Sequence, residues 1–229
     1  MNSFQPKQTS TTWRLVFVPA LISLAVTLLR LTGELRHWSP RWFTSETMGF
    51  LPSGVTWVVG ITWLALPFGV YFAWKRVHEN AGPASAGRAV AWAFVGLALM
   101  LIFRFVPWPK IGFPKVLLLI WLFMLIPAVI QYFGWPQLFK TLLAYGFAAR
   151  IPVVVVMFLA MRGHWGTHYD YVGMPSQFQM TFWLGFFWLA FFPQLIFWIS
   201  FTILAGSLAG SITALIVKKP QPASSAQPS

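Results

Sequence analysis

"PKVLLLIWLFMLIPAVIQYF" fills positions 114–133, and its only charged or amide side chains are those of Lys115 and Gln131. A helix needs about 20 apolar residues to cross the roughly 30 Å hydrocarbon core of a bilayer. Similar windows occupy residues 13–31, 54–74, 88–106 and 138–161, and a longer apolar run occupies residues 177–217. The sequence therefore predicts an all-α fold: a polytopic integral membrane helix bundle with six transmembrane helices in a single domain, residues 1–219.

The composition also favours a membrane over water. Apolar residues make up 58% of the chain and charged residues 9%, whereas soluble proteins carry about 25% charged residues. The 16 lysines and arginines give a formal net charge of +12, but most stand singly or in pairs at the ends of apolar runs. This distribution predicts the lipid bilayer as a partner and no nucleic acid. Cysteine is absent, which excludes disulfides and thiolate metal sites.

The last apolar run, residues 177–217, is too long for a single straight crossing. At about 1.5 Å per residue it would extend for roughly 60 Å, twice the hydrocarbon core. Ser176 and Gln179 form a capping box that predicts a helix start, and no polar turn divides the run. We expect one bent helix with a hinge near Pro193 and Gln194; a re-entrant pair is the alternative.

The ends of the predicted spans indicate an orientation. Lys7 and Arg14 precede the first apolar run, but no small-x-small cleavage pattern follows, so we expect an uncleaved anchor. Six spans place both termini on one side, which receives eight lysines and arginines against seven on the other. This balance predicts cytoplasmic termini in a plasma membrane or a bacterial inner membrane. Residues 220–229 are mainly Pro, Ser, Ala and Gln, a composition that predicts a disordered tail.

Arg150 lies near the centre of the fifth apolar run. A cation at that depth costs about 2.5–3.5 kcal/mol on insertion scales and normally faces the protein interior with a partner. No Asp or Glu lies inside a predicted span, so the expected partners are Gln131, Gln194, a carbonyl freed by a proline, water, lipid phosphate or an anionic ligand. We assign Arg150, Gln131 and Gln194 as substrate-binding residues; a purely structural arginine is the alternative.

Prolines recur inside the predicted spans, at Pro19, Pro67, Pro127, Pro152 and Pro193. Each removes one backbone hydrogen bond and clashes with the preceding turn, so several helices are expected to be proline-kinked. Bent helices suit a bundle that encloses a substrate cavity at middle depth, as in transporters built with broken helices.

Gly206 and Gly210 stand four residues apart among other small residues. Such spacing lets two helix backbones approach closely in a membrane. It predicts either self-association of two copies or packing within the same bundle.

The most polar stretch, "RGHWGTHYDYVGMP" at residues 162–175, lies between the fifth and sixth predicted spans. Together with the loop after the first span it forms a predicted outer-face polar cluster of Glu34, His37, His164, His168 and Asp170, and Glu46 belongs to the same side. Imidazole and carboxylate groups serve as metal ligands and as acid–base catalysts. Gly163 and Gly166, however, favour a loop, in which the four-residue spacing of the histidines loses its helical meaning. We expect an aromatic interfacial cap with no metal and no cofactor; a metal or catalytic site and a surface for a partner are the alternatives.

Ser39 and Pro40 predict a short helix in the loop after the first span. Serine is a favoured N-cap and proline a favoured first helical residue, and Gly49 would end the helix. This helix would hold Trp42 and Phe43 at the membrane interface.

The sequence contains no His-Glu-x-x-His or comparable hydrolase signature, so no catalytic residue is assigned. The preferred hypothesis is a membrane protein that binds or moves a small anionic or amphiphilic substrate in a cavity of bent helices, using Arg150. A membrane-embedded enzyme at the outer face is one alternative. A small accessory subunit of a larger membrane complex is the other.

Overall fold

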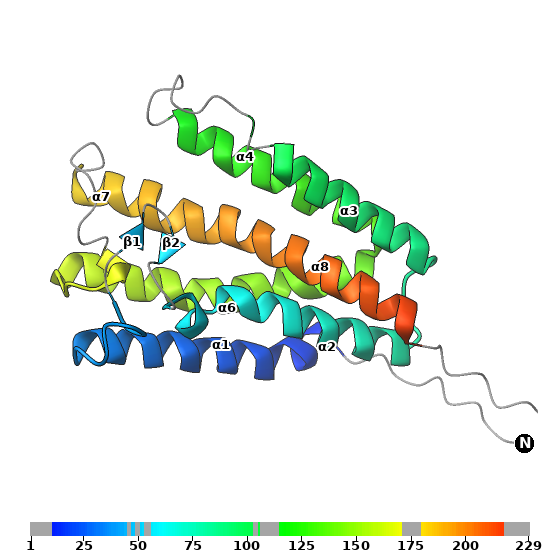
Figure 1. Cartoon of the computed structure of the whole chain (residues 1–229), viewed down its shortest axis with the longest axis horizontal. Helices are drawn as coiled ribbons and strands as arrows, with labels where there is room; N and C mark the ends of the chain where they lie inside the picture. Colours follow the sequence, from blue (N-terminus) through cyan, green and yellow to red (C-terminus); the bar gives the residue numbers. More distant parts are fainter. Residues whose placement is uncertain are drawn as a thin grey trace, which may run out of the picture.

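The computed structural model describes residues 11–44, 47–48, 51–52, 56–102, 105, 115–170 and 180–217. Its long helices lie side by side and alternate in direction along the longest axis of the molecule (Figure 1). They are α1 (Thr12–Leu35), α2 (Ala65–His78), α3 (Ala86–Ile102), α4 (Lys115–Val129), α6 (Pro136–Gly163) and α8 (Ile199–Ile216). The predicted helical bundle is confirmed.

Four helices in the described part of the chain are long and apolar enough to cross a membrane. They are Thr12–Leu35, Lys115–Gly134 (α4 continued by the short α5, Gln131–Gly134), Pro136–Gly163 and Phe182–Ile216. The apolar helix α3 has 17 residues and α2 has 14. The helices in the predicted windows 54–74 and 88–106 are therefore shorter than the four helices of membrane-spanning length.

The first part of window 54–74 is not α-helical. Two 3₁₀ turns, η1 (Thr56–Val59) and η2 (Thr62–Leu64), precede α2. Pro67 lies in the first turn of α2, where the backbone N–H groups have no intrahelical partner, so a proline is tolerated there. The α-helix consequently starts at Ala65 instead of residue 54 and continues to His78.

The last apolar run is one continuous helix, Phe182–Ile216, and not a re-entrant pair; the hinge near Pro193 and Gln194 stays a prediction. Its turns are α7 (Phe182–Gly185), the π-helical segments η7 (Phe186–Phe191) and η8 (Pro193–Trp198), and then α8. Pro193, which has no N–H to donate, begins the second π segment. π-helical turns are rare and frequently occur at functional sites. The expected capping box at Ser176 and Gln179 lies outside the described residues.

The helix α8 packs against α2, α3 and α6, and α1 packs against α6. At the crossing of α2 and α8 the backbones touch, since a Cβ added to Gly69 would lie 2.6 Å from the Cα of Gly206. A Cβ added to Gly210 would lie 3.0 Å from the Gly69 carbonyl oxygen and 2.7 Å from Leu138. Gly206 and Gly210 thus serve packing within the bundle. Self-association through the same residues stays a prediction.

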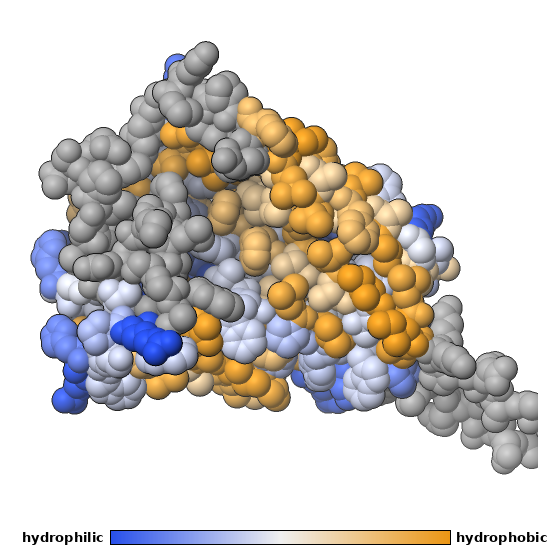
Figure 2. All heavy atoms as spheres, viewed as in Figure 1, coloured by the Kyte–Doolittle hydropathy of each residue, from blue (hydrophilic) through white to orange (hydrophobic). Residues whose placement is uncertain are grey.

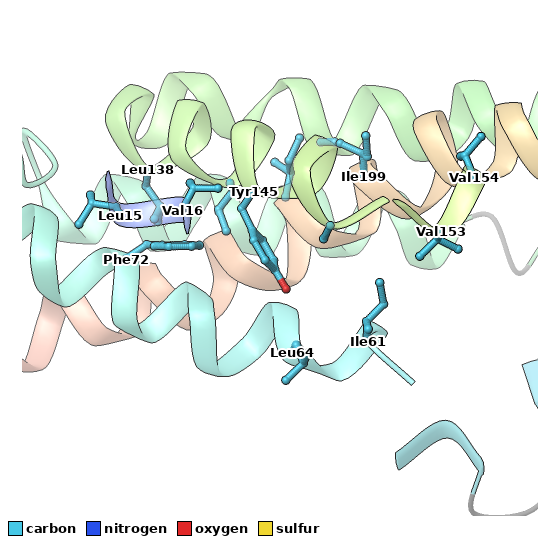
Figure 3. Packing of buried hydrophobic residues seen from close by; sticks show 14 of the residues in the cluster. Leu15, Val16, Ile61, Leu64, Phe72, Leu138, Tyr145, Val153, Val154 and Ile199 are labelled. Carbon is cyan, nitrogen blue, oxygen red and sulfur yellow. The ribbon is translucent and has the colours of Figure 1, made fainter. Parts of the chain in front are cut away.

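The core lies between α1, α2, α6 and α8 (Figure 3). Val16, Phe72 and Leu138, one from each of the first three helices, are fully buried. Tyr145 joins them with its ring 5.6 Å from that of Phe72, and its hydroxyl hydrogen-bonds with the Ser23 hydroxyl at 2.8 Å. The Tyr145 hydroxyl is therefore paired although its ring lies in an apolar core.

From Ser23 onward the buried face of α1 is mainly polar, whereas the exposed face of the helix is mainly apolar. Its buried polar residues are Ser23, Thr27, Arg30 and Glu34, whereas Phe17, Val18, Leu21, Ile22, Leu28 and Leu29 are exposed. A helix of a water-soluble protein has the opposite arrangement. In Figure 2 apolar side chains cover much of the visible face between the two ends of the bundle, and hydrophilic side chains gather at those ends. Both features are typical of a protein surrounded by lipid.

The segment after α1 contains a turn instead of the predicted short helix. The N–H groups of Trp42 and Phe43 both donate to the Ser39 carbonyl, at 3.0 and 3.1 Å, but no helix follows in the described residues up to 44. The Phe43 ring lies directly over Gly33, where any side chain would collide with it. The Phe43 ring thus packs on the end of α1, and residues 39–44 form a turn where a short helix was predicted. A hairpin of two-residue strands follows, β1 (Thr47–Met48) paired with β2 (Leu51–Pro52).

Candidate functional site

Arg150 of α6 faces the interior of the bundle, as the sequence predicts, and is 5% exposed. Its Nη1 donates to Oε1 of Gln194 at 3.2 Å, and its Nη2 donates to the Thr62 hydroxyl at 3.4 Å. The guanidinium carbon lies 5.0 Å from the centre of the Trp198 ring. These partners come from η2 and η8, so Arg150 joins α6 to two parts of the chain that are distant in sequence.

The π-helical segment η8 supplies two of these partners, Gln194 and Trp198. The amide of Gln194 is oriented from both ends, because its Nε2 donates to the sulfur of Met157 at 3.5 Å while its oxygen accepts from Arg150. Met157 lies two turns after Arg150 on α6. Gln194 therefore bridges two turns of one helix and presents its acceptor atom to the cation.

All described partners of Arg150 are neutral. Among the described residues, Glu34 pairs with Arg30 and lies against His168, and Glu79 pairs with Arg76; neither carboxylate contacts Arg150. The third described acid, Asp170, accepts a hydrogen bond from the Gly166 backbone N–H at 2.8 Å. The two hydrogen bonds of Arg150 are also longer than usual for a charged donor. Within the described chain Arg150 thus carries a positive charge that no carboxylate compensates.

Gln131, the third predicted substrate-binding residue, lies elsewhere. Its Nε2 donates to the Trp92 carbonyl at 3.2 Å and to the Pro127 carbonyl at 2.9 Å. It ties α5 to α3 and α4, and not to Arg150. The structure therefore brings Arg150 and Gln194 together and leaves Gln131 apart, because α5 packs on α3.

A second buried cluster, which we call the triad, consists of Arg30, Glu34 and His168. Arg30 Nε donates to Oε1 of Glu34 at 2.9 Å, and the backbone N–H of His168 donates to Oε2 of the same carboxylate at 2.9 Å. The His168 Nδ1 lies 2.6 Å from Oε1. Glu34 thus holds the segment after α6 against the last turn of α1. Because α1 extends to Leu35, Glu34 belongs to this helix and not to the loop in which it was expected.

Two nitrogen atoms of the triad are buried without an aligned hydrogen-bond partner in the described chain, Arg30 Nη2 and His168 Nδ1. The 2.6 Å approach of His168 Nδ1 to Glu34 Oε1 therefore lacks the alignment of a hydrogen bond. Burial lowers the pKa of His168 below its ordinary value of 6.5, and the contact with Glu34 opposes this shift. At neutral pH the imidazole is accordingly neutral.

The remaining residues of the predicted outer-face cluster are placed differently. His37 and His164 are exposed and have left-handed backbone, with φ of 50° and 49°. His164 ends α6, so the chain turns before His168 and the two histidines do not share a helix face. Asp170 shapes its own loop through Gly166, and Glu46 lies outside the described residues. Among the described residues no three His, Asp or Glu side chains are grouped as metal ligands would be.

Tyr169 is buried beside the triad. Its ring centre is 3.8 Å from that of His168, and its hydroxyl donates to the Thr27 carbonyl of α1 at 3.3 Å. Burial raises the pKa of Tyr169, and Arg30, Glu34 and Arg150 are all close enough to act on it electrostatically. The sequence indicated Tyr169 only as one aromatic of the interfacial cap, with no partner assigned to it. The spacing of Ser23, Thr27, Arg30 and Glu34 on one face of the first helix is a signal that could have located its contacts.

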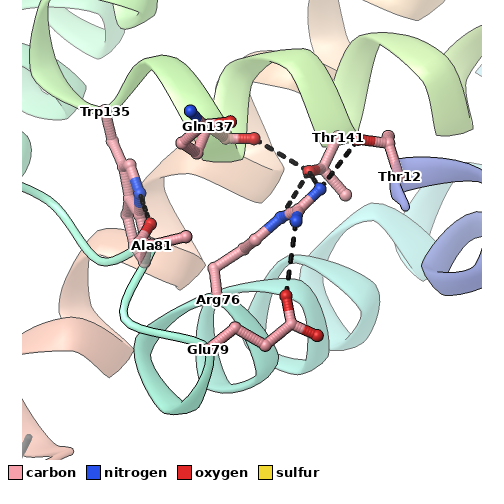
Figure 4. Close-up of polar contacts among 7 residues, drawn as sticks. All are labelled: Thr12, Arg76, Glu79, Ala81, Trp135, Gln137 and Thr141. Atoms are coloured by element: carbon pink, nitrogen blue, oxygen red, sulfur yellow. Dashed lines mark hydrogen bonds and ion pairs between the residues drawn. The ribbon is translucent and has the colours of Figure 1, made fainter. Parts of the chain in front are cut away.

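Arg76 has a structural role that the sequence did not reveal. Like the other basic residues at the ends of apolar runs, it was expected to face the lipid bilayer, but it is 4% exposed. Its guanidinium donates to the Thr141 hydroxyl at 2.9 and 3.1 Å, to the Thr12 hydroxyl at 2.8 Å, and pairs with Glu79 at 3.3 Å (Figure 4). Arg76 therefore fastens α1, α2 and α6 together at the end of the bundle opposite the triad (Figure 1).

Comparisons with protein-family models, with curated proteins and with solved structures give no match for this chain.

Proposed function

We propose that the protein is a multi-pass membrane protein of six helices that binds a small anion, or the anionic head of an amphiphile, at Arg150. Four helices of membrane-spanning length and the apolar outer face of α1 support the membrane location. Transporters tend to bind their substrates near the middle of the bilayer, and Arg150 lies near the middle of α6. Transport of the bound group is therefore part of the proposal.

The observation that carries this proposal is the buried, uncompensated charge of Arg150. A guanidinium has five N–H donors, and the described chain occupies two of them, both with neutral oxygens. Removal of a cation from water is unfavourable unless a counter-charge or strong hydrogen bonds replace hydration. An anionic group would supply both, and two oxygens of a carboxylate or of a tetrahedral phosphate match the guanidinium fork.

A purely structural arginine is the main rival explanation. Arg76 is an example of a structural arginine in this chain, since its partners are one carboxylate and two hydroxyl groups. Arg150 differs, because in the described chain it donates two hydrogen bonds and both acceptors are neutral. Its inward orientation also supports a binding role over that of an accessory subunit, which requires no buried charge.

Thermal unfolding followed by the fluorescence of the 14 tryptophans tests the proposal on protein in lipid nanodiscs. The probes are inorganic phosphate, hexyl phosphate and, as a neutral control, hexanol. We expect saturable stabilisation by hexyl phosphate, about 2.7 kcal/mol at one hundred times the Kd, and none by hexanol. Arg150→Met should abolish this effect. Arg162→Met, at an exposed position of the same helix, should retain it.

Two results would overturn the proposal. One is the absence of stabilisation by either phosphate probe in the unmodified protein. The other is stabilisation that survives in Arg150→Met. Glu46→Gln, which removes the one acidic side chain outside the described residues, serves as a second control and should leave the stabilisation unchanged.

A further inference from the structure

The helix Phe182–Ile216 changes its helical period along its length, as its contacts with α6 show. These contacts join Gly210 to Leu138, Ile199 to Gly146, Gln194 to Arg150 and Met157, and Phe186 to Phe158. Gly210 follows Ile199 by 11 residues, and three turns of an α-helix contain about 11 residues. Ile199 follows Phe186 by 13 residues, because the intervening turns are π-helical. Their hydrogen bonds run from residue i to i+5, which adds roughly one residue to a turn.

An α-helical register of the same segment would present other residues to α6. Counted back from Ile199 in steps of about 3.6 residues, the positions now held by Gln194, Ala190 and Phe186 would pass to Leu195, Phe192 and Trp188. The second set is entirely apolar, and Trp188 is aromatic like Phe186, so it too can pack against α6. In the observed register Trp188 faces α4 instead, with its ring 5.0 Å from that of Trp121. The two registers therefore differ chiefly in whether Gln194 or Leu195 lies at Arg150.

Pro193 favours the π register that the structure shows. In an α-helix its ring would clash with the carbonyl four residues earlier, and it has no N–H to donate. Helices in membranes accommodate proline through local π turns that pair the affected backbone groups again. The segment η8 begins at Pro193. The proline thus opposes the α register, while the apolar residues on either side permit it.

The π register is also the better one for an anion at Arg150. In this register the Gln194 oxygen accepts from Arg150, and its Nε2 donates to the sulfur of Met157 at 3.5 Å. A thioether sulfur is a weak acceptor, so an anionic oxygen beside Arg150 would attract this N–H more strongly. Leu195 has no polar hydrogen to offer in the α register. An anion therefore gains a second donor only while the segment is π-helical.

We propose that residues 186–198 form a register switch for the anion site, with Gln194 as its positioning residue. The π register places Gln194 at Arg150 and binds the anion, and the α register places Leu195 there and releases it. This inference rests on the proposed function. A ligand shifts an equilibrium between two states by its difference in affinity for them, so a bound anion favours the π register. Helix register shifts take microseconds to milliseconds, which suits repeated binding and release.

Paired cysteines report the register directly, because the natural chain contains no cysteine. Phe158→Cys with Phe186→Cys should be joined by a short thiol-specific crosslinker in the π register, in which these side chains are in contact. Phe158→Cys with Trp188→Cys should be joined only in the α register. In lipid nanodiscs, saturating hexyl phosphate should raise the first yield and lower the second. With Gln194→Leu added, the probe should change neither yield.

Proline variants shift the register without a ligand. Pro193→Ala should raise the yield of the 158–188 crosslink and weaken hexyl phosphate binding severalfold, because it removes the obstacle to the α register. Pro127→Ala, at a proline inside the α-helical α4, is the matched control and should change neither quantity.

Two results would contradict the switch and leave the proposed function intact. One is the absence of the 158–188 crosslink in both the native and the Pro193→Ala backgrounds. The other is a pair of crosslink yields that bound hexyl phosphate leaves unchanged. If the unmodified protein bound no hexyl phosphate at all, the switch and the proposed function would both be overturned.

Discussion

Arg150 Nη1 donates to Gln194 Oε1 at 3.2 Å, and this bond joins the middle of α6 to a π-helical segment inside the bundle. The glutamine is neutral, so it orients the cation without compensating its charge. A pair of this kind holds a guanidinium in position and leaves its charge available to a ligand. The following variants separate this role from a structural one.

Exchange of Arg150 and Gln194 singly and together measures their interaction. Gln194→Leu should lower the free energy of unfolding by about 1–3 kcal/mol, because it leaves the buried guanidinium with one hydrogen bond fewer. Arg150→Met should be close to neutral or stabilising, since it removes a buried charge and keeps a similar volume. In the Arg150→Met background, Gln194→Leu should cost less than it does alone. Equal costs in both backgrounds would show that the observed bond contributes nothing. Denaturant unfolding of protein in micelles supplies the three values.

Acidification should destabilise the folded protein through His168. Because the folded state holds the pKa of this group below 6.5, the unfolded chain binds a proton more readily. The stability from the neutral imidazole is therefore complete above pH 6.5 and is lost as the pH falls towards the folded-state pKa. Thermal midpoints between pH 7.5 and 5 should decrease less in His168→Gln than in the unmodified protein. An equal decrease in both would exclude His168 as the titrating group.

Larger side chains at the α2–α8 crossing should disrupt the fold of the single chain. Gly69→Leu and Gly206→Leu should each destabilise it by at least about 1–3 kcal/mol, since each places atoms against the opposite backbone. Gly87→Leu is a matched control, because the position is open apart from Ser85 at 3.9 Å. Chemical crosslinking tests self-association separately. Loss of crosslinked dimer in Gly206→Leu, with unchanged stability, would support an interface between copies instead.

Reporter fusions test the proposed topology. Fusions at Ser229 and within residues 81–85 should both report the cytoplasm, and a fusion after Arg162 should report the opposite compartment. The helix directions in Figure 1 place the segment 79–85 and the end of α8 together and the end of α6 at the other end. If Ser229 and the position after Arg162 reported the same compartment, the six-span proposal would be wrong.

The positions of the long helices and the inward orientation of Arg150 were predictable from the sequence, because both depend on local hydrophobicity and on the cost of a charge in an apolar setting. Gln194 was predictable for the same reason. The separation of Gln131 from Arg150 was not predictable, because it depends on the packing of α5 against α3. Apolar windows indicate which segments are helical, but they do not indicate which helix faces meet.

The triad was predictable only in part. Arg30 and Glu34 stand four residues apart, which favours an ion pair on one helix, and His168 was recognised as polar and close in space. The sequence did not predict that His168, and not His37 or His164, contacts Glu34. This contact depends on the left-handed backbone of His164, which turns the chain at the end of α6. Arg76 was misjudged because its partners, Thr12 and Thr141, carry no charge and lie in distant segments.

Isothermal titration of hexyl phosphate into the protein in nanodiscs tests the central claim most directly, since it counts binding sites without reference to stability. We expect one saturable site per chain in the unmodified protein and in Arg162→Met, and no binding in Arg150→Met. Binding of equal stoichiometry and affinity in Arg150→Met would contradict the assignment of Arg150 as the anion-binding residue.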